Sequence, residues 1–169
     1  MADDRTDMDV KAAAYAALEE LGIAYESDEH EPVYTIDEMV ALGLHEKGMI
    51  VKNLFLRDAK GKRHFLVLVP QDAHADLKSI GAKLACPRLS FASEERLERF
   101  LGLKKGAVTP LGVMNDADHA VEVVVARELT RQAKLGVHPC DNTATVWLTW
   151  PDLKKFIEHH GNKMRTIDL

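Results

Sequence analysis

Two strand-like segments that follow each other directly restrict the fold more than any other feature of this sequence. Residues 49–57, which begin MIVKNLFL, and residues 64–69, HFLVLV, are rich in aliphatic, β-branched and aromatic side chains. The turn between them, DAKGK at 58–62, is short and contains glycine, which is typical of a β-hairpin. The sequence therefore predicts antiparallel pairing at the centre of a sheet.

Helical patterns surround this hairpin without a regular βαβ rhythm. Thr6 is the expected N-cap of a first helix that Gly22 ends, and Thr35 with Glu38 forms a capping box. Further helices are predicted at 72–82, 94–102 and 150–161, shorter strands at 23–27, 88–92, 120–126 and 143–149, and connecting segments at 103–116 and 128–142. This order predicts an α/β fold of the mixed, α+β kind, rather than a doubly wound nucleotide-binding fold. The length of 169 residues and the lack of a linker predict one domain over residues 1–169.

Composition excludes several classes of protein. Hydrophobic residues make up 46% and charged residues 29% of the chain, which is typical of a globular protein. No apolar run approaches the ~20 residues that span a bilayer, and the acidic start MADDRTDMDV does not resemble a signal peptide. The two cysteines, Cys86 and Cys140, are far apart, so we expect a reduced, cytoplasmic protein without a membrane contact.

Familiar catalytic signatures are missing. The sequence contains no GxGxxG, Walker, HExxH or GxSxG pattern, and its eight histidines are scattered. We therefore expect no metal site and no cofactor. Cys140 lies two residues after His138, but residues at this separation rarely form a nucleophile and base pair, so we expect no thiol mechanism.

Lys52 and Asn53 are polar residues in the middle of an apolar strand. Because strand side chains alternate, Lys52 shares one side with Ile50 and Leu54, whereas Asn53 shares the other side with Val51. At least one side must be core. We expect the two residues to reach a common site only if a bulge or the end of the strand intervenes.

Three short segments could carry chemistry: VKN at 51–53, GAVTP at 106–110 with its extension LGVMND, and GVHPCDNTAT at 136–145. Each has an ordinary structural explanation. Lys52 can extend from a sheet edge into water, Gly106 and Pro110 can be turn formers, and His138 can make a loop contact. Only their order and combination point to a function.

Together with HEPVYTIDEM at 30–39, KNLFLRD at 52–58 and DLKKFIEHHG at 152–161, these segments make the chain resemble the YbaK/ProX aminoacyl-tRNA editing superfamily. Within it, the chain is most similar to the free-standing alanyl-tRNA(Pro) deacylases, the prolyl-tRNA synthetase-associated domain proteins. The resemblance covers nearly the whole chain. It implies a curved mixed β-sheet flanked by helices, and hydrolysis in trans of the ester that joins a wrong amino acid, expected to be alanine, to the 3′ end of tRNA(Pro).

The resemblance also implies functional positions. The expected catalytic residues are Lys52, Gly106, Thr109, Pro110 and His138, and the expected substrate-binding residues are Asn53, Val108, Gly112 and Asn142. Lys52 would hold the phosphate of the terminal adenosine, and the glycine-bearing loop would form a stiff pocket wall with backbone N–H donors. His138 is expected to shape the pocket or bind the substrate rather than to act as a general base.

The expected partners are the acceptor end of an aminoacyl-tRNA and, transiently, prolyl-tRNA synthetase. With a net charge of −5, no binding to DNA is expected, and contact with RNA should be local. Basic residues gather at Lys60, Lys62 and Arg63 and at Lys104 and Lys105. Two alternatives remain open: a deacylase for another small aminoacyl group such as serine or cysteine, and a non-catalytic binder of tRNA ends or nucleotides on the same fold.

Overall fold

The computed structural model describes residues 7–169, so Thr6, the predicted first N-cap, lies outside the described residues. The helices are α1 (Asp7–Glu20), α2 (Ile36–Ala41), α3 (Leu77–Lys83), α4 (Glu94–Leu101) and α5 (Trp150–His160). The strands are β1 (Glu26–Glu29), β2 (Met49–Arg57), β3 (His64–Pro70), β4 (Ser90–Phe91), β5 (Val121–Ala126), β6 (Leu135–Val137), β7 (Ala144–Leu148) and β8 (Met164–Ile167). Short 3-10 helices occupy Leu44–Glu46, Pro110–Asn115 and Arg127–Arg131.

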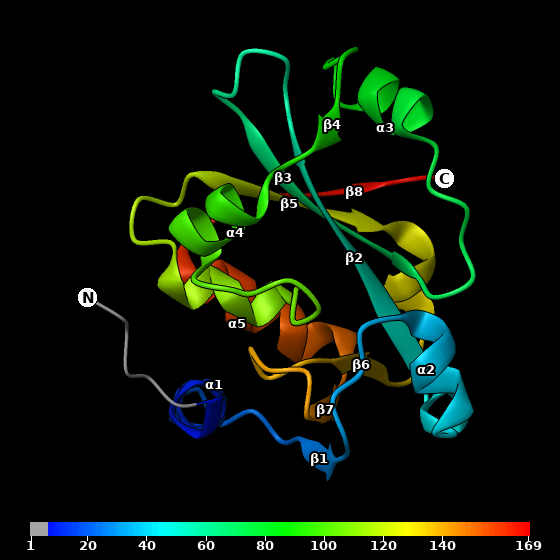
Figure 1. The fold of residues 1–169 in the computed structure, drawn as a ribbon, viewed down its shortest axis with the longest axis vertical. Helices are drawn as coiled ribbons and strands as arrows, with labels where there is room; N and C mark the ends of the chain where they lie inside the picture. Colours follow the sequence, from blue (N-terminus) through cyan, green and yellow to red (C-terminus); the bar gives the residue numbers. More distant parts are fainter. Residues whose placement is uncertain (1–6) are drawn as a thin grey trace.

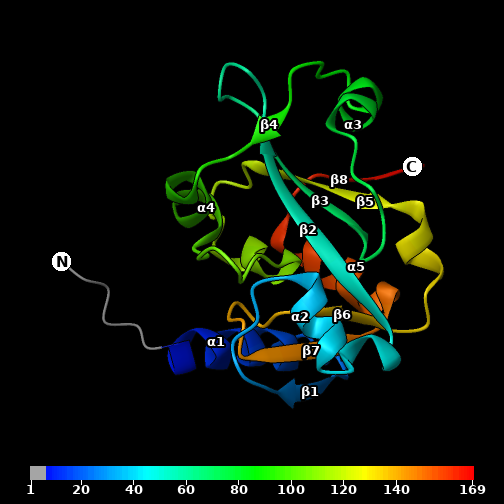
Figure 2. The ribbon, with the colours of Figure 1, turned by 45° about the vertical axis from the view of Figure 1, so that its right-hand side comes forward.

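The strands form one mixed sheet in the order β1-β7-β6-β2-β3-β5-β8, with β4 paired to β2. The predicted hairpin is confirmed, because β2 and β3 pair antiparallel from Val51–Pro70 to Arg57–His64. The pairs β2–β6, β3–β5 and β5–β8 are parallel, whereas β1–β7 and β6–β7 are antiparallel. Figures 1 and 2 show that β2 crosses the molecule and joins the two halves of the twisted sheet.

Helices cover both faces of the sheet, which confirms the predicted fold class. On one face, α1, α4 and α5 pack on alternate residues of β2, β3 and β5, including Val51, Leu68 and Val123. On the opposite face, α3 packs on Leu54 and the intervening residues of β3 and β5. A smaller cluster joins α2 to Ile50 and to the buried ring of Trp147. Because both faces of β2 pack against the core, the sequence of this strand is a nearly continuous hydrophobic run rather than an alternation of apolar and polar residues.

Several predicted boundaries were wrong. The strand predicted at 23–27 lies at Glu26–Glu29, where a polar segment pairs with β7 at the edge of the sheet, while Ile23 packs into the core instead. The helix predicted at 72–82 begins at Leu77, because Asp76 is the cap that accepts the N–H of Lys78.

Two strands had no distinct signal in the sequence. β6 has only three residues within a segment predicted as a connection, and β8 has mixed polar and apolar residues near the end of the chain. Their pairing with β2 and with β5 decides that they are strands. Among residues 7–169, no helix is long and apolar enough to cross a bilayer.

Candidate active site

A pocket lies where β2 and β6 part. The two strands pair only at Met49–Leu135 and Ile50–Gly136, and β4 joins the same edge of β2 only at Leu56 and Arg57. No strand among the described residues covers that edge at residues 51–55. A pocket of about 300 Å³ opens there, which is at the lower end for small-molecule sites. It is lined by residues 33–36 and Met39, by residues 51–53, by Gly106 and Val108, and by residues 136–138.

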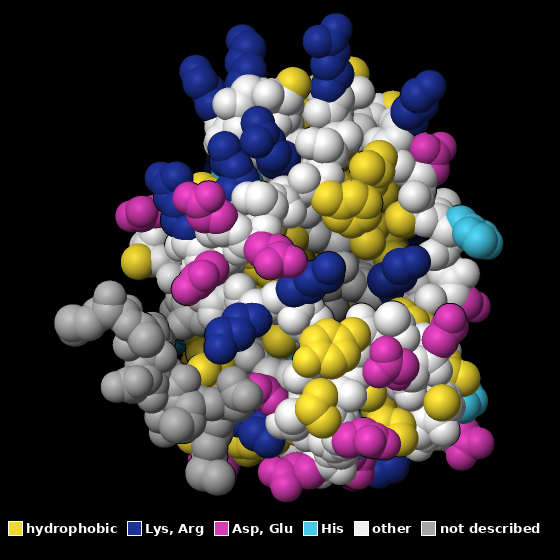
Figure 3. Space-filling model, viewed as in Figure 1, with side chains coloured by type: hydrophobic (Ala, Val, Ile, Leu, Met, Phe, Trp, Pro, Cys, Tyr) yellow, Lys and Arg dark blue, Asp and Glu magenta, His cyan; other side chains and the backbone are white. Residues whose placement is uncertain are grey.

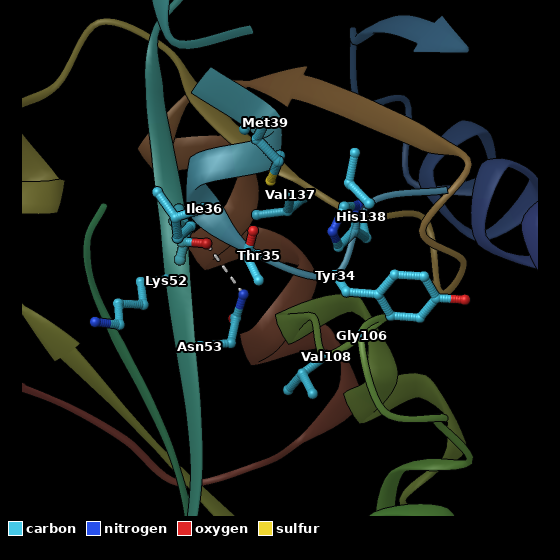
Figure 4. A pocket seen from close by; sticks show the side chains of 13 residues that line it. Tyr34, Thr35, Ile36, Met39, Lys52, Asn53, Gly106, Val108, Val137 and His138 are labelled. Carbon is cyan, nitrogen blue, oxygen red and sulfur yellow. Dashed lines mark hydrogen bonds between the residues drawn. The ribbon is translucent and has the colours of Figure 1, made fainter. Parts of the chain in front are cut away.

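Lys52 and Asn53 both line this pocket although their side chains leave β2 in opposite directions (Figure 4). The register between β2 and β3 is unbroken from Val51 to Arg57, so no bulge is needed. Both residues border the pocket because it opens at the uncovered edge of the strand, and the ammonium group of Lys52 points away from the other labelled side chains (Figure 4). The bulge considered from the sequence is therefore absent from β2.

The polar groups of these two residues are only partly engaged. Asn53 donates its Nδ2 to the carbonyl oxygen of Val51 at 3.2 Å, and its Oδ1 is buried without a hydrogen-bond partner among the described residues. Leaving a buried acceptor unsatisfied costs about 1–3 kcal/mol. Lys52 is half-buried, and none of the ion pairs among the described residues includes its ammonium group. The edge of the pocket thus offers the positive charge of Lys52 to a ligand, whereas the Oδ1 of Asn53 is buried from solvent.

Gly106 brings the loop after α4 close to the segment before α2. Its φ is +88°, and a Cβ at this position would lie 2.7 Å from Cδ1 of Tyr34. Tyr34 is 66% exposed and covers the loop at the mouth of the pocket (Figure 4). A glycine is required both by the left-handed backbone and by the close approach of this ring.

Asn142 does not line the pocket but fastens one of its walls. The side-chain Nδ2 of Asn142 donates to the backbone carbonyl oxygen of Val33 at 2.8 Å. The backbone carbonyl oxygen of Asn142 in turn accepts the N–H of Val33 at 3.2 Å. These two bonds tie the segment before α2 to the loop that follows β6. The predicted substrate-binding residue Asn142 is thus placed behind the wall.

His138 lies at the end of β6 with its ring almost completely buried. Its Nδ1 lies 3.0 Å from the carbonyl oxygen of Ala144, so Nδ1 carries the proton and Nε2 is left as an acceptor. Burial lowers the pKa of His138, an effect that the Ala144 carbonyl partly opposes. The imidazole is therefore neutral at pH 7, and protonating it as the pH falls below its usual range costs stability.

Besides Asn142, three predicted site residues lie outside the pocket lining, namely Thr109, Pro110 and Gly112. Thr109 is buried, and its hydroxyl oxygen accepts the N–H of Leu111, which caps the 3-10 helix that Pro110 begins. Gly112 lies inside this helix, where a Cβ would be 2.7 Å from Cδ1 of Leu103. These residues hold the pocket loop from below, as part of the core.

Sequence reasoning missed the wall formed by the segment before α2 and by α2 itself. Tyr34, Thr35, Ile36 and Met39 all line the pocket. Thr35 caps α2 as predicted, since its hydroxyl oxygen accepts the N–H of Glu38 at 3.1 Å. The motif HEPVYTIDEM contained the signal, but its spacing alone does not tell which side chains face a cavity.

Thiol chemistry would depend on Cys140, and metal chemistry on clusters of acidic, cysteine and histidine side chains. Burial raises the pKa of the Cys140 thiol to about 12, so this sulfur is not a thiolate at neutral pH. Among residues 7–169, no group of three or more His, Cys, Asp or Glu side chains is arranged to hold a metal ion.

Comparison with known proteins matches residues 30–156 to the family model of the aminoacyl-tRNA editing domain. The chain is 49% identical over 163 residues to the prolyl-tRNA editing protein ProX of Acetoanaerobium sticklandii. The aligned region covers 96% of this chain and 99% of that protein. It is 36% identical over 153 residues to the prolyl-tRNA synthetase associated domain-containing protein 1 of Danio rerio, covering 89% and 83% of the two chains.

A solved structure has the same fold. It belongs to a protein proposed to be a trans-editing enzyme for prolyl tRNA synthetase, and it matches 95% of this chain and 96% of its own with a TM-score of 0.73. The sequence identity of 21% limits this likeness to the fold.

Proposed function

The chain belongs to the aminoacyl-tRNA editing domain family and is an aminoacyl-tRNA deacylase; from this premise we propose that it removes alanine from mischarged tRNA(Pro) in trans, with residues 1–169 acting as one editing domain. The names of the prolyl-tRNA editing protein and of the prolyl-tRNA synthetase associated proteins support the choice of tRNA. The same names support a transient association with prolyl-tRNA synthetase.

One observation carries the proposal: segments far apart in the sequence meet at one small pocket, and each brings a different chemical group. The β2 edge contributes Lys52 and Asn53, the glycine loop contributes backbone, and the end of β6 contributes His138. A small aminoacyl ester with its ribose needs such a mixture of apolar walls and a few polar groups.

The walls suit selection by size. A synthetase site built for proline rejects alanine weakly, because each missing methylene group changes binding by only ~1–3 kcal/mol. A second, smaller site corrects this by excluding the larger residue. Gly106 and Val108 form one wall, and their loop rests on a 3-10 helix whose first four residues are buried, so it cannot expand cheaply for a proline ring.

The chemistry requires little more than positioning. An aminoacyl ester is already activated, so a well-placed water and donors for the developing oxyanion are sufficient. In the glycine loop, the N–H of Ala107 donates to Lys104, whereas those of Gly106 and Val108 bond to no other described residue. These two N–H groups are our candidates for the oxyanion site.

The remaining polar groups hold the substrate. Lys52 provides a positive charge for the phosphate of the terminal adenosine. The Nε2 of His138 is an acceptor for the ammonium or hydroxyl groups of the aminoacyl-ribose end, and Asn53 lines the same pocket. A neutral His138 that accepts in this way orients the substrate, and the terminal ribose hydroxyl can orient the water.

A deacylation panel tests the proposal. Purified protein is incubated with tRNA(Pro) charged with alanine, serine, cysteine or proline, and with alanine on tRNA(Ala), and the loss of each ester is measured. We expect fast release of alanine from tRNA(Pro) and slow release of proline. If serine or cysteine were released faster than alanine, that amino acid would be the substrate instead of alanine. If no amino acid were released, the proposal would be refuted.

A further inference from the structure

Phe91 is an exposed aromatic ring on the sheet, outside the pocket. It is the second residue of β4, lies opposite Leu56 on β2, and is 62% exposed, whereas Leu56 is completely buried. Exposing a phenyl ring of this size forgoes most of the stability that its burial would contribute. The ring is therefore available to an aromatic partner outside the protein.

The register of β4 places Phe91 on the same face of the sheet as Lys52. Residues paired directly across an antiparallel ladder project from the same face, so Phe91 shares the face of Leu56 and, by alternation, of Lys52. The neighbours of Phe91 agree with this, because Leu89 packs in the cluster beneath α3 and Ala92 packs in the opposite cluster.

The spacing between Lys52 and Phe91 suits a nucleic-acid strand. From Lys52 to Leu56 the strand rises by roughly 13 Å, at ~3.3 Å per residue. A stacked nucleic-acid strand covers that length in roughly four nucleotides, at ~3.4 Å each, and an extended strand covers it in fewer. Only two cytosines precede the terminal adenosine, so a strand whose last phosphate lies at Lys52 and which follows β2 presents one of them to Phe91 when it runs extended rather than stacked.

The segment of the chain that carries Phe91 is basic, which favours a polyanion as the partner. Residues 57–92 contain seven Lys and Arg against three Asp and Glu, whereas the whole chain has a net charge of −5. In Figure 3 a patch of hydrophobic side chains lies over the upper part of β2, below β4 and α3, with Lys and Arg side chains above and beneath it. A protein partner would bury the apolar patch but would have no need of the cations on both sides of it.

We propose that Phe91 is a stacking platform for an unpaired cytosine of the tRNA 3′ end, which runs along β2 from the phosphate held by Lys52. This inference rests on the proposed function, because it takes the acceptor end of a tRNA as the substrate. Aromatic stacking tolerates any base, since every base has a π-face, and it is typically worth ~1–3 kcal/mol per base. The interaction adds affinity for the CCA end without reading the amino acid.

The test measures binding of uncharged RNA, so that it does not depend on which ester is hydrolysed. A labelled RNA hairpin with a 3′ CCA overhang is titrated with the protein, and its Kd is compared with that of the same hairpin carrying abasic sites in place of the two cytosines. The variants are Phe91→Ala, Phe91→Leu and Phe91→Tyr, and Leu169→Ala serves as the control for loss of another exposed apolar side chain. Thermal unfolding confirms that each variant is folded.

Stacking predicts a distinct pattern. Phe91→Ala and Phe91→Leu should raise the Kd for the CCA hairpin roughly 5- to 150-fold, whereas Phe91→Tyr and Leu169→Ala should leave it within about twofold. The abasic hairpin should bind weakly to the wild type and lose nothing further with Phe91→Ala. A wild-type Kd that is equal for both hairpins, or a Phe91→Leu protein that binds like wild type, would overturn stacking even if the deacylation panel succeeds.

Discussion

Replacing Gly106 by alanine separates the role of the pocket loop from a general loss of stability. Gly106 has a φ of +88°, and a Cβ there would lie 2.7 Å from Cδ1 and 3.2 Å from Cε1 of Tyr34. Gly22 is a matched control, because its φ is +69° and a Cβ at this position has no atom within 4 Å. Both variants carry the strain of a left-handed alanine, but only one disturbs the pocket.

The expected magnitudes follow from these contacts. A left-handed alanine costs about 1–2 kcal/mol, so both variants should lose a similar amount of unfolding free energy. The added methyl group at Gly106 must also displace the Tyr34 ring or shift the loop, and overpacking of this kind costs typically ~1–3 kcal/mol. Because the ring is exposed, the displacement should appear mainly in substrate binding and catalysis. We expect kcat/KM for alanyl-tRNA(Pro) to fall roughly 5- to 150-fold.

The assay combines chemical denaturation with single-turnover deacylation of alanyl-tRNA(Pro) by each variant. Gly22→Ala should keep the wild-type rate despite its lower stability, and Gly106→Ala should not acquire activity on prolyl-tRNA(Pro), since the pocket becomes smaller. The reasoning fails if both variants deacylate at the wild-type rate, or if both lose activity equally.

Four further predictions test the other roles. Lys52→Ala should lower kcat/KM roughly 10- to 150-fold with little loss of stability, as expected for the loss of a contact to a charged phosphate. The control Lys154→Ala on α5 should leave kcat/KM unchanged, and equal rates for the two variants would contradict the role of Lys52 in binding the phosphate. Val108→Ala should raise the ratio of prolyl to alanyl hydrolysis roughly tenfold, and an unchanged ratio would mean that this wall is not the sieve. Gly112→Ala should lower the unfolding free energy by ~1–3 kcal/mol, measured in urea, because its Cβ meets Leu103, while the activity per folded molecule is retained. Cys140→Ser and treatment with EDTA should each leave the deacylation rate within about twofold, because the buried thiol is protonated; activity lost with EDTA and restored by zinc would contradict a metal-free mechanism.

Local signals in the sequence were sufficient for much of the fold. The β2–β3 hairpin and the N-cap at Thr35 were correctly predicted, because the hydrogen bonds and side-chain periods that define them involve residues close together in the chain. The same alternation correctly separated Lys52 from Asn53 across β2. These features depend on backbone geometry that neighbouring residues determine by themselves.

The tertiary structure decided where the pocket is and which residues line it. Gly106 and Gly112 look alike as loop glycines, yet one lies beneath Tyr34 and the other against Leu103. Sequence alone also could not tell that β6 exists, or that it leaves β2 after Ile50 and opens the edge where Lys52 and Asn53 meet one site. The physical reason is that this edge is defined by pairing between residues more than eighty positions apart, and contacts at such a separation leave no periodicity in either segment.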